Sequence, residues 1–172
     1  MEPIVNRVAE SDIEVFDLAS LWNDGKVVEF DLAPFLFQGL ILKEKDFRQA
    51  MKTHDWTVYA DAHVAVHCSA DAIIPTWAYM LVAAKLKDIV ASIGFGTPEE
   101  VIRDFFVRAL DNQDWSTYQN RIVVIKGCGN HIVPMDAYLI ATQKLQDVAR
   151  KLMYGEPCSS VPLWRRPKAK QS

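Results

Sequence analysis

Hydrophobic positions along the chain follow the same succession of patterns twice. Each time, an amphipathic stretch with helical spacing ends near an Asp-Trp pair, and a short β-branched run follows it. A polar loop then leads to a longer apolar stretch opened by proline, and a last apolar run stands before Gly-x-Pro. The pattern therefore predicts helix, strand, helix and strand in each copy.

The boundaries of these elements follow from the residue types. Strands are predicted in four segments: His63–His67, Ser92–Phe95, Arg121–Lys126 and Lys151–Tyr154. Pro75 and Pro134 mark the starts of the two longer helices, because proline lacks the N–H that the first helical turn leaves unpaired. Thr97 to Glu100 is expected to cap and open a further helix, which has no counterpart after the second copy.

Comparison of the chain with itself supports the two copies. Residues 47–98 align without a gap with residues 106–157, and 15 of the 52 pairs are identical. Ordinary residue frequencies would give about three. Strand, helix and strand in sequence imply a right-handed crossover between parallel strands. We therefore predict an α/β fold in which a duplicated unit forms a mostly parallel sheet with pseudo-twofold symmetry.

The N-terminal segment, residues 1–46, lies outside the repeat. Val27–Phe30 and Phe35–Leu42 are candidate strand or core segments within it, and we expect the segment to cover one edge or face of the sheet.

Length and charge narrow the class of protein. With 172 residues, half of them apolar, the chain can bury the core of one domain, and we expect residues 1–172 to form it. Nineteen basic and 22 acidic residues give a formal charge of −3 with interspersed signs, which predicts binding to neither nucleic acid nor an anionic membrane. The basic residues in 165–172 are expected to form a flexible tail.

The N-terminus and the apolar stretches bear on the expected location. No basic segment followed by an apolar one is present near Met1, so the expected location is the cytoplasm. The longest apolar stretch, residues 73–84, is shorter than the roughly 20 residues that span a bilayer and indicates a buried helix.

All three cysteines fall in polar loops that follow predicted strands. Ligands of parallel α/β sheets bind beyond the carboxyl ends of the strands. If those ends lie side by side, Cys68, Cys128 and Cys158 would bind a soft metal, either zinc or iron. The fourth ligand would be one of four nearby side chains: His67, His131, Asp71 and Glu156. No Cys-x-x-Cys pair fixes two ligands locally, so the spacing leaves the metal open.

A thiol-dependent enzyme is a second hypothesis. Cys128 lies between two glycines and shortly before the helix that starts at Pro134, so helix N–H groups and Lys126 would favour its thiolate. No Cys-x-x-Cys motif supplies a second cysteine to resolve a disulfide with Cys128. His131 is a candidate general base by its residue type alone.

A non-catalytic scaffold or interaction module, including a homo-oligomer, is the third hypothesis. Cys68 and Cys128 occupy adjacent rather than equivalent repeat positions, so the repeat does not copy a cysteine site. The repeated Asp-Trp and tyrosine positions, Asp55, Trp56 and Tyr59 with their counterparts, are expected to cap and pack a helix-to-strand connection. No phosphate-binding glycine loop, nucleophile elbow or zinc-protease motif is present. The sequence leaves the reaction, the small-molecule ligand and the oligomeric state open.

Several long strings of the chain resemble one bacterial family. They are F-L-F-Q-G-L-I-L-K-E-K-D-F-R (35–48), V-A-V-H-C-S-A-D-A-I-I-P-T-W-A-Y-M-L (64–81), V-V-I-K-G-C-G (123–129) and Y-G-E-P-C-S-S-V-P (154–162). Nearly the whole chain resembles this family, which is known only as a domain of unknown function, the 2480 family. The resemblance implies no activity. It implies a link to metal or iron–sulfur handling, which favours the metal hypothesis.

Overall fold

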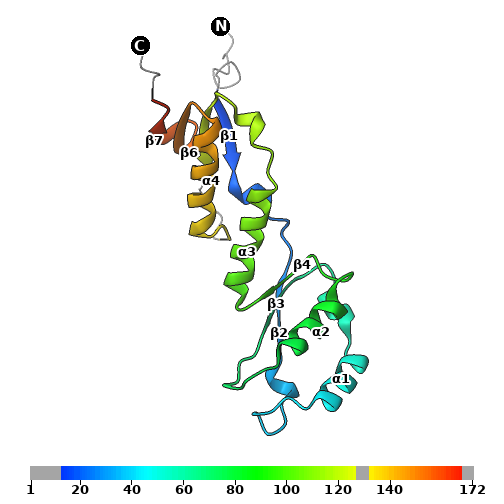
Figure 1. Cartoon of the computed structure of the whole chain (residues 1–172). Helices are drawn as coiled ribbons and strands as arrows, with labels where there is room; N and C mark the ends of the chain where they lie inside the picture. Colours follow the sequence, from blue (N-terminus) through cyan, green and yellow to red (C-terminus); the bar gives the residue numbers. More distant parts are fainter. Residues whose placement is uncertain (1–12, 127–131, 168–172) are drawn as a thin grey trace. The chain divides into compact units, whose positions relative to one another are not determined.

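The computed structural model describes residues 13–126 and 132–167 and has a mixed α/β architecture. The chain folds into two compact units (Figure 1). Unit 1 comprises Met1–Asn23 and Phe106–Ser172, and unit 2 comprises Asp24–Phe105. Each unit has a sheet of its own, so each is described separately.

Unit 2 is built on a three-stranded parallel sheet in the order β2-β3-β4. The strands are β2 (Val27–Asp31), β3 (His63–His67) and β4 (Ser92–Phe95), and the α-helices before and after β3 are α1 (Glu44–Thr53) and α2 (Thr76–Leu86). Short 3-10 helices follow β2 and precede β3, at Ala33–Phe35 (η2) and Trp56–Tyr59 (η3).

The two faces of this sheet bury different partners. Phe30, Val64 and Val66 point to one face and form a core with Phe47 of α1 and Val82 of α2. Figure 1 shows both helices on that side of the sheet. Helix α3 (Pro98–Asp111) begins in unit 2, and its Val101 and Phe105 contact Gly94 and His63, which belong to the opposite face.

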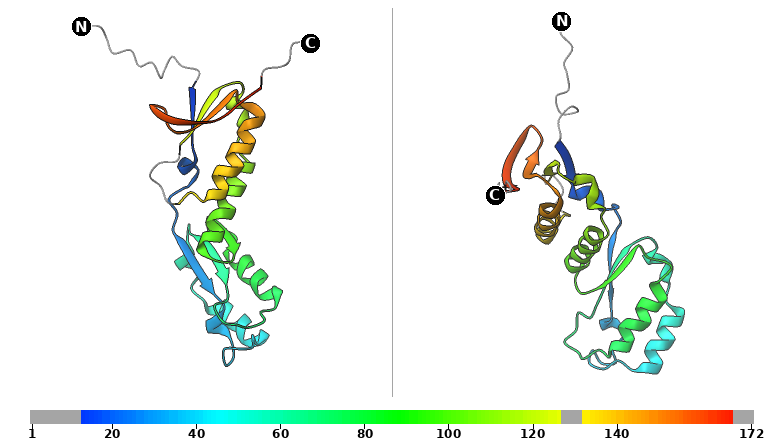
Figure 2. Two further views of the ribbon diagram at one scale, coloured as in Figure 1. Left: turned by 90° about the vertical axis from the view of Figure 1, so that its left-hand side faces the viewer. Right: turned by 45° about the horizontal axis from the view of Figure 1, so that its top comes forward.

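Unit 1 is built on a four-stranded sheet in the order β1-β5-β6-β7. The strands are β1 (Ile13–Asp17), β5 (Ile122–Lys126), β6 (Lys151–Glu156) and β7 (Ser159–Arg165). The first three are parallel, and β7 returns antiparallel to β6 (Figure 2). Helix α4 (Met135–Val148) links β5 to β6, and 3-10 helices lie at Leu18–Leu21 (η1) and Trp115–Tyr118 (η4).

The structure confirms the predicted strands and helix starts. β3 and β4 have the predicted bounds, whereas β5 begins one residue later and β6 ends two residues later than expected. Pro75 and Pro134 are the N-cap residues of α2 and α4. Thr97 and Glu100 form a reciprocal capping box, because the Thr97 N–H donates to Glu100 Oε2 at 2.8 Å and the Glu100 N–H donates to Thr97 Oγ1 at 3.3 Å.

The capping prediction for the repeated Asp-Trp pairs is also confirmed. Asp55 accepts a hydrogen bond from the Thr57 N–H at 3.0 Å, and Asp114 accepts one from the Ser116 N–H at 2.9 Å. Each aspartate thereby begins a 3-10 helix whose Trp and Tyr rings pack inward.

Three local predictions are corrected. Phe35–Leu42 forms the end of η2 and a tight turn closed by an isolated bridge between Phe37 and Ile41, instead of a strand. The segment after β6 is the turn of the β6–β7 hairpin. Glu156 is the last residue of β6, and Cys158 lies in the turn. The helix expected to be buried, α2, buries only one side and leaves Met80 exposed.

The expected basic tail is in part structured. Arg165 is the last residue of β7. The Arg166 guanidinium donates to the Asp147 carbonyl at 2.9 Å and to Asn120 Oδ1 at 3.3 Å. Residues 168–172 lie outside the described part of the chain.

Both units contain the same order of elements. In each, an N-terminal strand pairs in parallel with a central strand, and a helix opened by proline leads to a third parallel strand. The N-terminal segment thus supplies β1 to one sheet and β2 to the other. The twofold axis between the copies stays a prediction. None of the helices in the described ranges is both long and apolar enough to cross a membrane.

Candidate functional site

Polar side chains gather at the carboxyl ends of β2 and β3 in unit 2, with Asp31 at their centre. Its Oδ1 accepts hydrogen bonds from the Ala33 and Ser69 N–H groups, both at 2.9 Å. Its Oδ2 accepts the Ser69 hydroxyl proton at 2.5 Å. One carboxylate therefore accepts a hydrogen bond from the first residue of η2 and holds the loop that follows β3.

The pKa of Asp31 lies below its usual value as a net result of opposing causes. Desolvation by burial raises it, whereas the hydrogen bonds from Ser69 and Ala33 and the nearby His67 ring lower it. Together, the causes that lower the pKa outweigh desolvation. Asp31 is thus a structural anion at neutral pH, with its lone pairs already engaged.

His67, the last residue of β3, contacts a second carboxylate. Its Nε2 lies 3.1 Å from Glu29 Oε1, although the approach lacks the alignment of a hydrogen bond. Glu29 and Asp31 are two positions apart on β2, and Asp31 is the register partner of His67. His67 therefore lies between two carboxylates on one face of the sheet.

Cys68 follows His67 and is half-buried as a free thiol. Its Sγ donates to the Ala70 carbonyl at 3.6 Å. Within the described residues, no hydrogen bond joins this thiol or the Ser69 hydroxyl to a histidine. The group lacks the nucleophile-to-base contact that acyl-transfer chemistry uses.

An apolar pocket adjoins this cluster on the α2 face of the sheet. It has a volume of about 280 Å³ and lies between α2 and the ends of β3 and β4. Tyr79, Met80 and Ala83 of α2 line one side, and Val66, Ile93 and Phe95 line the other. Phe95 packs edge-on against Tyr79 at 5.3 Å between ring centroids. We call this the unit 2 pocket.

Tyr79 links the pocket to the polar cluster. Burial of its ring, followed by the nearby Cys68 and Asp31, raises the pKa of Tyr79. The phenol therefore stays protonated and can donate a hydrogen bond. No described residue accepts one from it, so the donor is available to a bound molecule.

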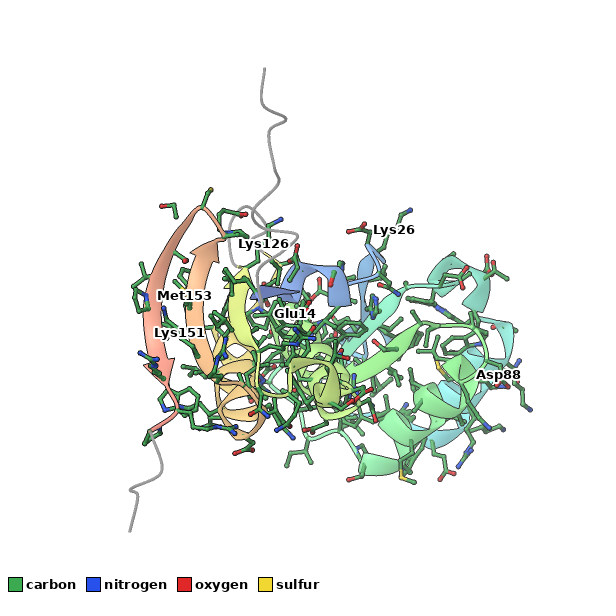
Figure 3. The ribbon with its side chains drawn as sticks, turned by 90° about the horizontal axis from the view of Figure 1, so that it is seen from above. Glu14, Lys26, Asp88, Lys126, Lys151 and Met153 are labelled. Carbon is green, nitrogen blue, oxygen red and sulfur yellow. The ribbon has the colours of Figure 1, made fainter. Side chains whose placement is uncertain are left out.

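The corresponding place in unit 1 has a related arrangement. Asp17 ends β1, accepts a hydrogen bond from the Ala19 N–H at 3.0 Å, and pairs with Lys126 at 3.5 Å. Lys126, labelled in Figure 3, is the last residue of β5. Asp17 and Asp31 thus each accept a hydrogen bond from the N–H two residues later, at the start of a 3-10 helix. A basic residue is the register partner of each aspartate.

The residues predicted to bind a metal fall in different parts of the fold. His67, Cys68 and Asp71 follow β3 in unit 2, whereas Glu156 and Cys158 belong to the β6–β7 hairpin of unit 1. Cys128 and His131 lie outside the described residues. Among residues 13–126 and 132–167, no group of three or more His, Cys, Asp or Glu side chains is arranged to hold a metal ion. The described residues therefore do not form the predicted three-cysteine cluster, whose convergence stays a prediction.

Sequence reasoning missed Asp31, Ser69 and the role of Tyr79. A signal for Asp31 is present, because the string F-D-L-A occurs at residues 16–19 and again at residues 30–33. In the fold, each copy of this string ends a strand and starts a 3-10 helix. Ser69 gave no such signal, since its contact with Asp31 spans 38 residues.

The fold and the site together define a mixed α/β protein with two mostly parallel sheets, a polar cluster held by Asp31 and an adjoining apolar pocket. The chain belongs to the family described as "Protein of unknown function (DUF2480)", which it matches over residues 2–166. No curated protein and no solved structure gives a significant match.

Proposed function

We propose that the chain is a non-catalytic interaction module whose unit 2 pocket binds an apolar group about the size of one aromatic ring. One observation carries the proposal: Met80 and Phe95 line the same pocket and remain 67% and 71% exposed. Burying a side chain of this size contributes about 1.5–3 kcal/mol. Adjacent exposed apolar side chains therefore indicate a surface that is covered when a partner binds.

The size and polarity of the pocket define its ligand. A volume of about 280 Å³ is near the lower end of small-molecule sites, which suits a single ring better than a fused cofactor. The lining is apolar except for the Tyr79 phenol, which can orient one acceptor atom. Such a ring can come from a free small molecule or from an aromatic side chain of a partner protein. The partner can also be a second copy of this chain.

The test uses the full chain labelled with ¹³C at the methionine methyl groups. Met80 lines the pocket, whereas Met51 is buried in the unit 2 core away from it and serves as the internal reference. We expect p-cresol to shift the Met80 methyl signal saturably, with a Kd on the order of 1 mM for a ligand of this size. A short peptide with a central tyrosine tests the second source. A Met80 signal that depends on protein concentration without a probe would identify a second copy as the occupant.

Two variants make the result specific. Phe95→Ala removes one wall of the pocket and is expected to weaken p-cresol binding several-fold while leaving the fold intact, since Phe95 is largely exposed. Val58→Ala removes an exposed apolar side chain outside the pocket and should bind as the parent chain does. If no ligand shifts Met80, or if Phe95→Ala binds equally well, the proposal is wrong.

A zinc or iron site is the second candidate function. Its support is that Cys68 and Cys158 form no disulfide, so both sulfur atoms can bind a metal as thiolates, and that the family resemblance implies metal or iron–sulfur handling. It requires Cys68, Cys128 and Cys158 to converge with one of His67, His131, Asp71 or Glu156. Metal analysis decides it and is argued below at the scale of the whole molecule.

We also infer that the two units arose by duplication of one ancestral unit. The 15 identical pairs between residues 47–98 and 106–157, and the shared order of elements, support this origin.

A further inference from the structure

Unit 1 contains a second pocket in the place that corresponds to the unit 2 pocket. It has a volume of about 370 Å³ and lies between α4 and the ends of β5 and β6, with Leu163 of β7 at one side. We call this the unit 1 pocket. We infer that it is a second binding site, specific for a small ring that carries a polar group; the ligand class rests on the proposed function above.

The same repeat positions line both pockets. Val66, Tyr79 and Met80 of the unit 2 pocket correspond to Ile125, Tyr138 and Leu139 of the unit 1 pocket, each 59 residues later. Ala83 and Phe95 likewise correspond to Thr142 and Tyr154. A chance surface hollow would not recur at five equivalent positions, so the pocket is a built feature of the unit.

The aromatic pair is retained as well. Tyr138 and Tyr154 meet edge-on, with 6.0 Å between ring centroids and an interplanar angle of 80°. Tyr79 and Phe95 have the same arrangement at 5.3 Å and 85°. Edge-to-face rings present both a ring face and an edge, which suits the packing of another ring.

The rim of the unit 1 pocket is also exposed. Met135 and Leu139 are 71% and 59% exposed although both line the pocket. Met153 of β6, labelled in Figure 3, is next to Tyr154 in the strand and therefore points to the other face of the sheet. Met135 is thus a methyl probe of this pocket, and Met153 is not.

Two substitutions between the copies change the chemistry of the pocket. Tyr154 replaces Phe95 and adds a hydroxyl group, which has no hydrogen-bond partner among the described residues. Thr142 replaces Ala83, but its hydroxyl already donates to the Tyr138 carbonyl at 2.7 Å. Of the two added hydroxyl groups, only that of Tyr154 is therefore available to a ligand. It can donate a hydrogen bond to a polar group on the ligand or accept one from it.

The two pockets also differ in the strand that lies beside them. β7 pairs with β6 and contributes Leu163 to the unit 1 pocket. In the described part of unit 2, β4 is the last strand of its sheet, so that pocket has no equivalent side wall. A larger pocket with one more wall and one more hydroxyl is expected to hold a phenol better than the corresponding hydrocarbon.

The experiment compares p-cresol with toluene, which differ by one hydroxyl group, on the full methionine-labelled chain. Met135 reports the unit 1 pocket and Met80 reports the unit 2 pocket in the same titration. We expect both signals to shift saturably. The preference for p-cresol over toluene should be about two- to tenfold greater at Met135 than at Met80, the effect of one net hydrogen bond.

Reciprocal variants test the role of the hydroxyl. Tyr154→Phe should reduce the preference at Met135 to the value found at Met80 without changing toluene binding. Phe95→Tyr should raise the preference at Met80 and leave Met135 unchanged. Both changes alter one hydroxyl on a partly exposed ring, so the fold is expected to persist.

The outcomes separate the two proposals. A shift at Met80 without one at Met135 would overturn the second site and leave the proposed function standing. A shift at Met135 alone would support the second site and contradict the proposed role of the unit 2 pocket. Binding at both sites with a Tyr154→Phe variant that keeps its preference for p-cresol would overturn the assigned specificity.

Discussion

At the scale of the residue, Asp31 shows how one carboxylate organises a loop. It accepts three hydrogen bonds, from Ala33 on its own side of the chain and from Ser69 beyond β3. Asp17 accepts the corresponding hydrogen bond in unit 1, from the Ala19 N–H, and pairs with Lys126. The aspartate that ends each N-terminal strand, β1 or β2, thereby holds the start of the 3-10 helix that follows it.

Replacement of Asp31 tests this role. Asp31→Asn should lower the free energy of unfolding by about 1–2 kcal/mol at pH 7, because the amide cannot accept as many hydrogen bonds and carries no charge. The pKa of Asp31 is lower in the folded state than in the unfolded state, so its contribution is fully present above about pH 4 and is lost as the pH falls through the folded pKa.

Urea unfolding of the parent chain and the variant between pH 7 and pH 3 measures this difference. The two stabilities should converge only below about pH 4. The matched control is Asp24→Asn, at an exposed aspartate of the same unit, which should stay within about 0.5 kcal/mol of the parent chain. A pH-independent difference between Asp31→Asn and the parent chain would contradict the assigned role of the charge.

At the scale of the element, local capping decides where the helices begin. Thr97 and Glu100 satisfy each other's N–H groups at the start of α3. Gly96, immediately before them, has φ of +111°, and the corresponding Gly155 has φ of +122°. Gly96 directly follows β4, and Gly155 is the next-to-last residue of β6. Both positions need a positive φ, which glycine adopts without strain, and this explains why glycine recurs there.

Loss of the capping box should weaken α3. Thr97→Ala is expected to lower the free energy of unfolding by about 1 kcal/mol, since it removes the acceptor for the Glu100 N–H. Thr76→Ala makes the same change in the first turn of α2, where no side chain caps the helix, and should cost less than about 0.5 kcal/mol. Thermal and urea unfolding measure both, and equal losses in the two variants would show that the capping box contributes nothing specific.

At the scale of the whole molecule, the division into two units separates the residues that the metal hypothesis brings together. His67, Cys68 and Asp71 belong to unit 2, and Glu156 and Cys158 belong to unit 1. Among the described residues, neither unit has three of these side chains arranged to hold a metal ion. The hypothesis therefore depends on Cys128 and on convergence between loops of both units.

Elemental analysis of protein purified without oxygen tests that convergence. If the interaction module is the correct function, we expect less than one-tenth equivalent of zinc or iron. In a Cys128→Ser background, alkylation should then be faster at the exposed Cys158 than at the half-buried Cys68, because reactivity follows exposure. Stoichiometric metal, with all thiols protected until a chelator is added, would establish the metal site instead.

The candidate site was predictable only in part. His67 and Cys68 were identified because they follow a predicted strand, and loops at strand ends bind ligands. The pockets could not be identified, because each combines α2 or α4 with the ends of strands that are far apart in sequence. The apolar residues Met80 and Phe95 gave no signal either, since a sequence does not show which apolar side chains remain exposed.

The sequence alone determined the order of elements, the proline-opened helices, the capping of α3 at Thr97 and the capping aspartates Asp55 and Asp114. These depend on periodicity and on contacts within about four residues. Only the tertiary structure decided that β1 pairs with β5 and β2 with β3, that β7 closes the edge of β6, and that Asp31 holds Ser69. These are pairings between distant segments, and their register depends on which apolar faces can be buried together.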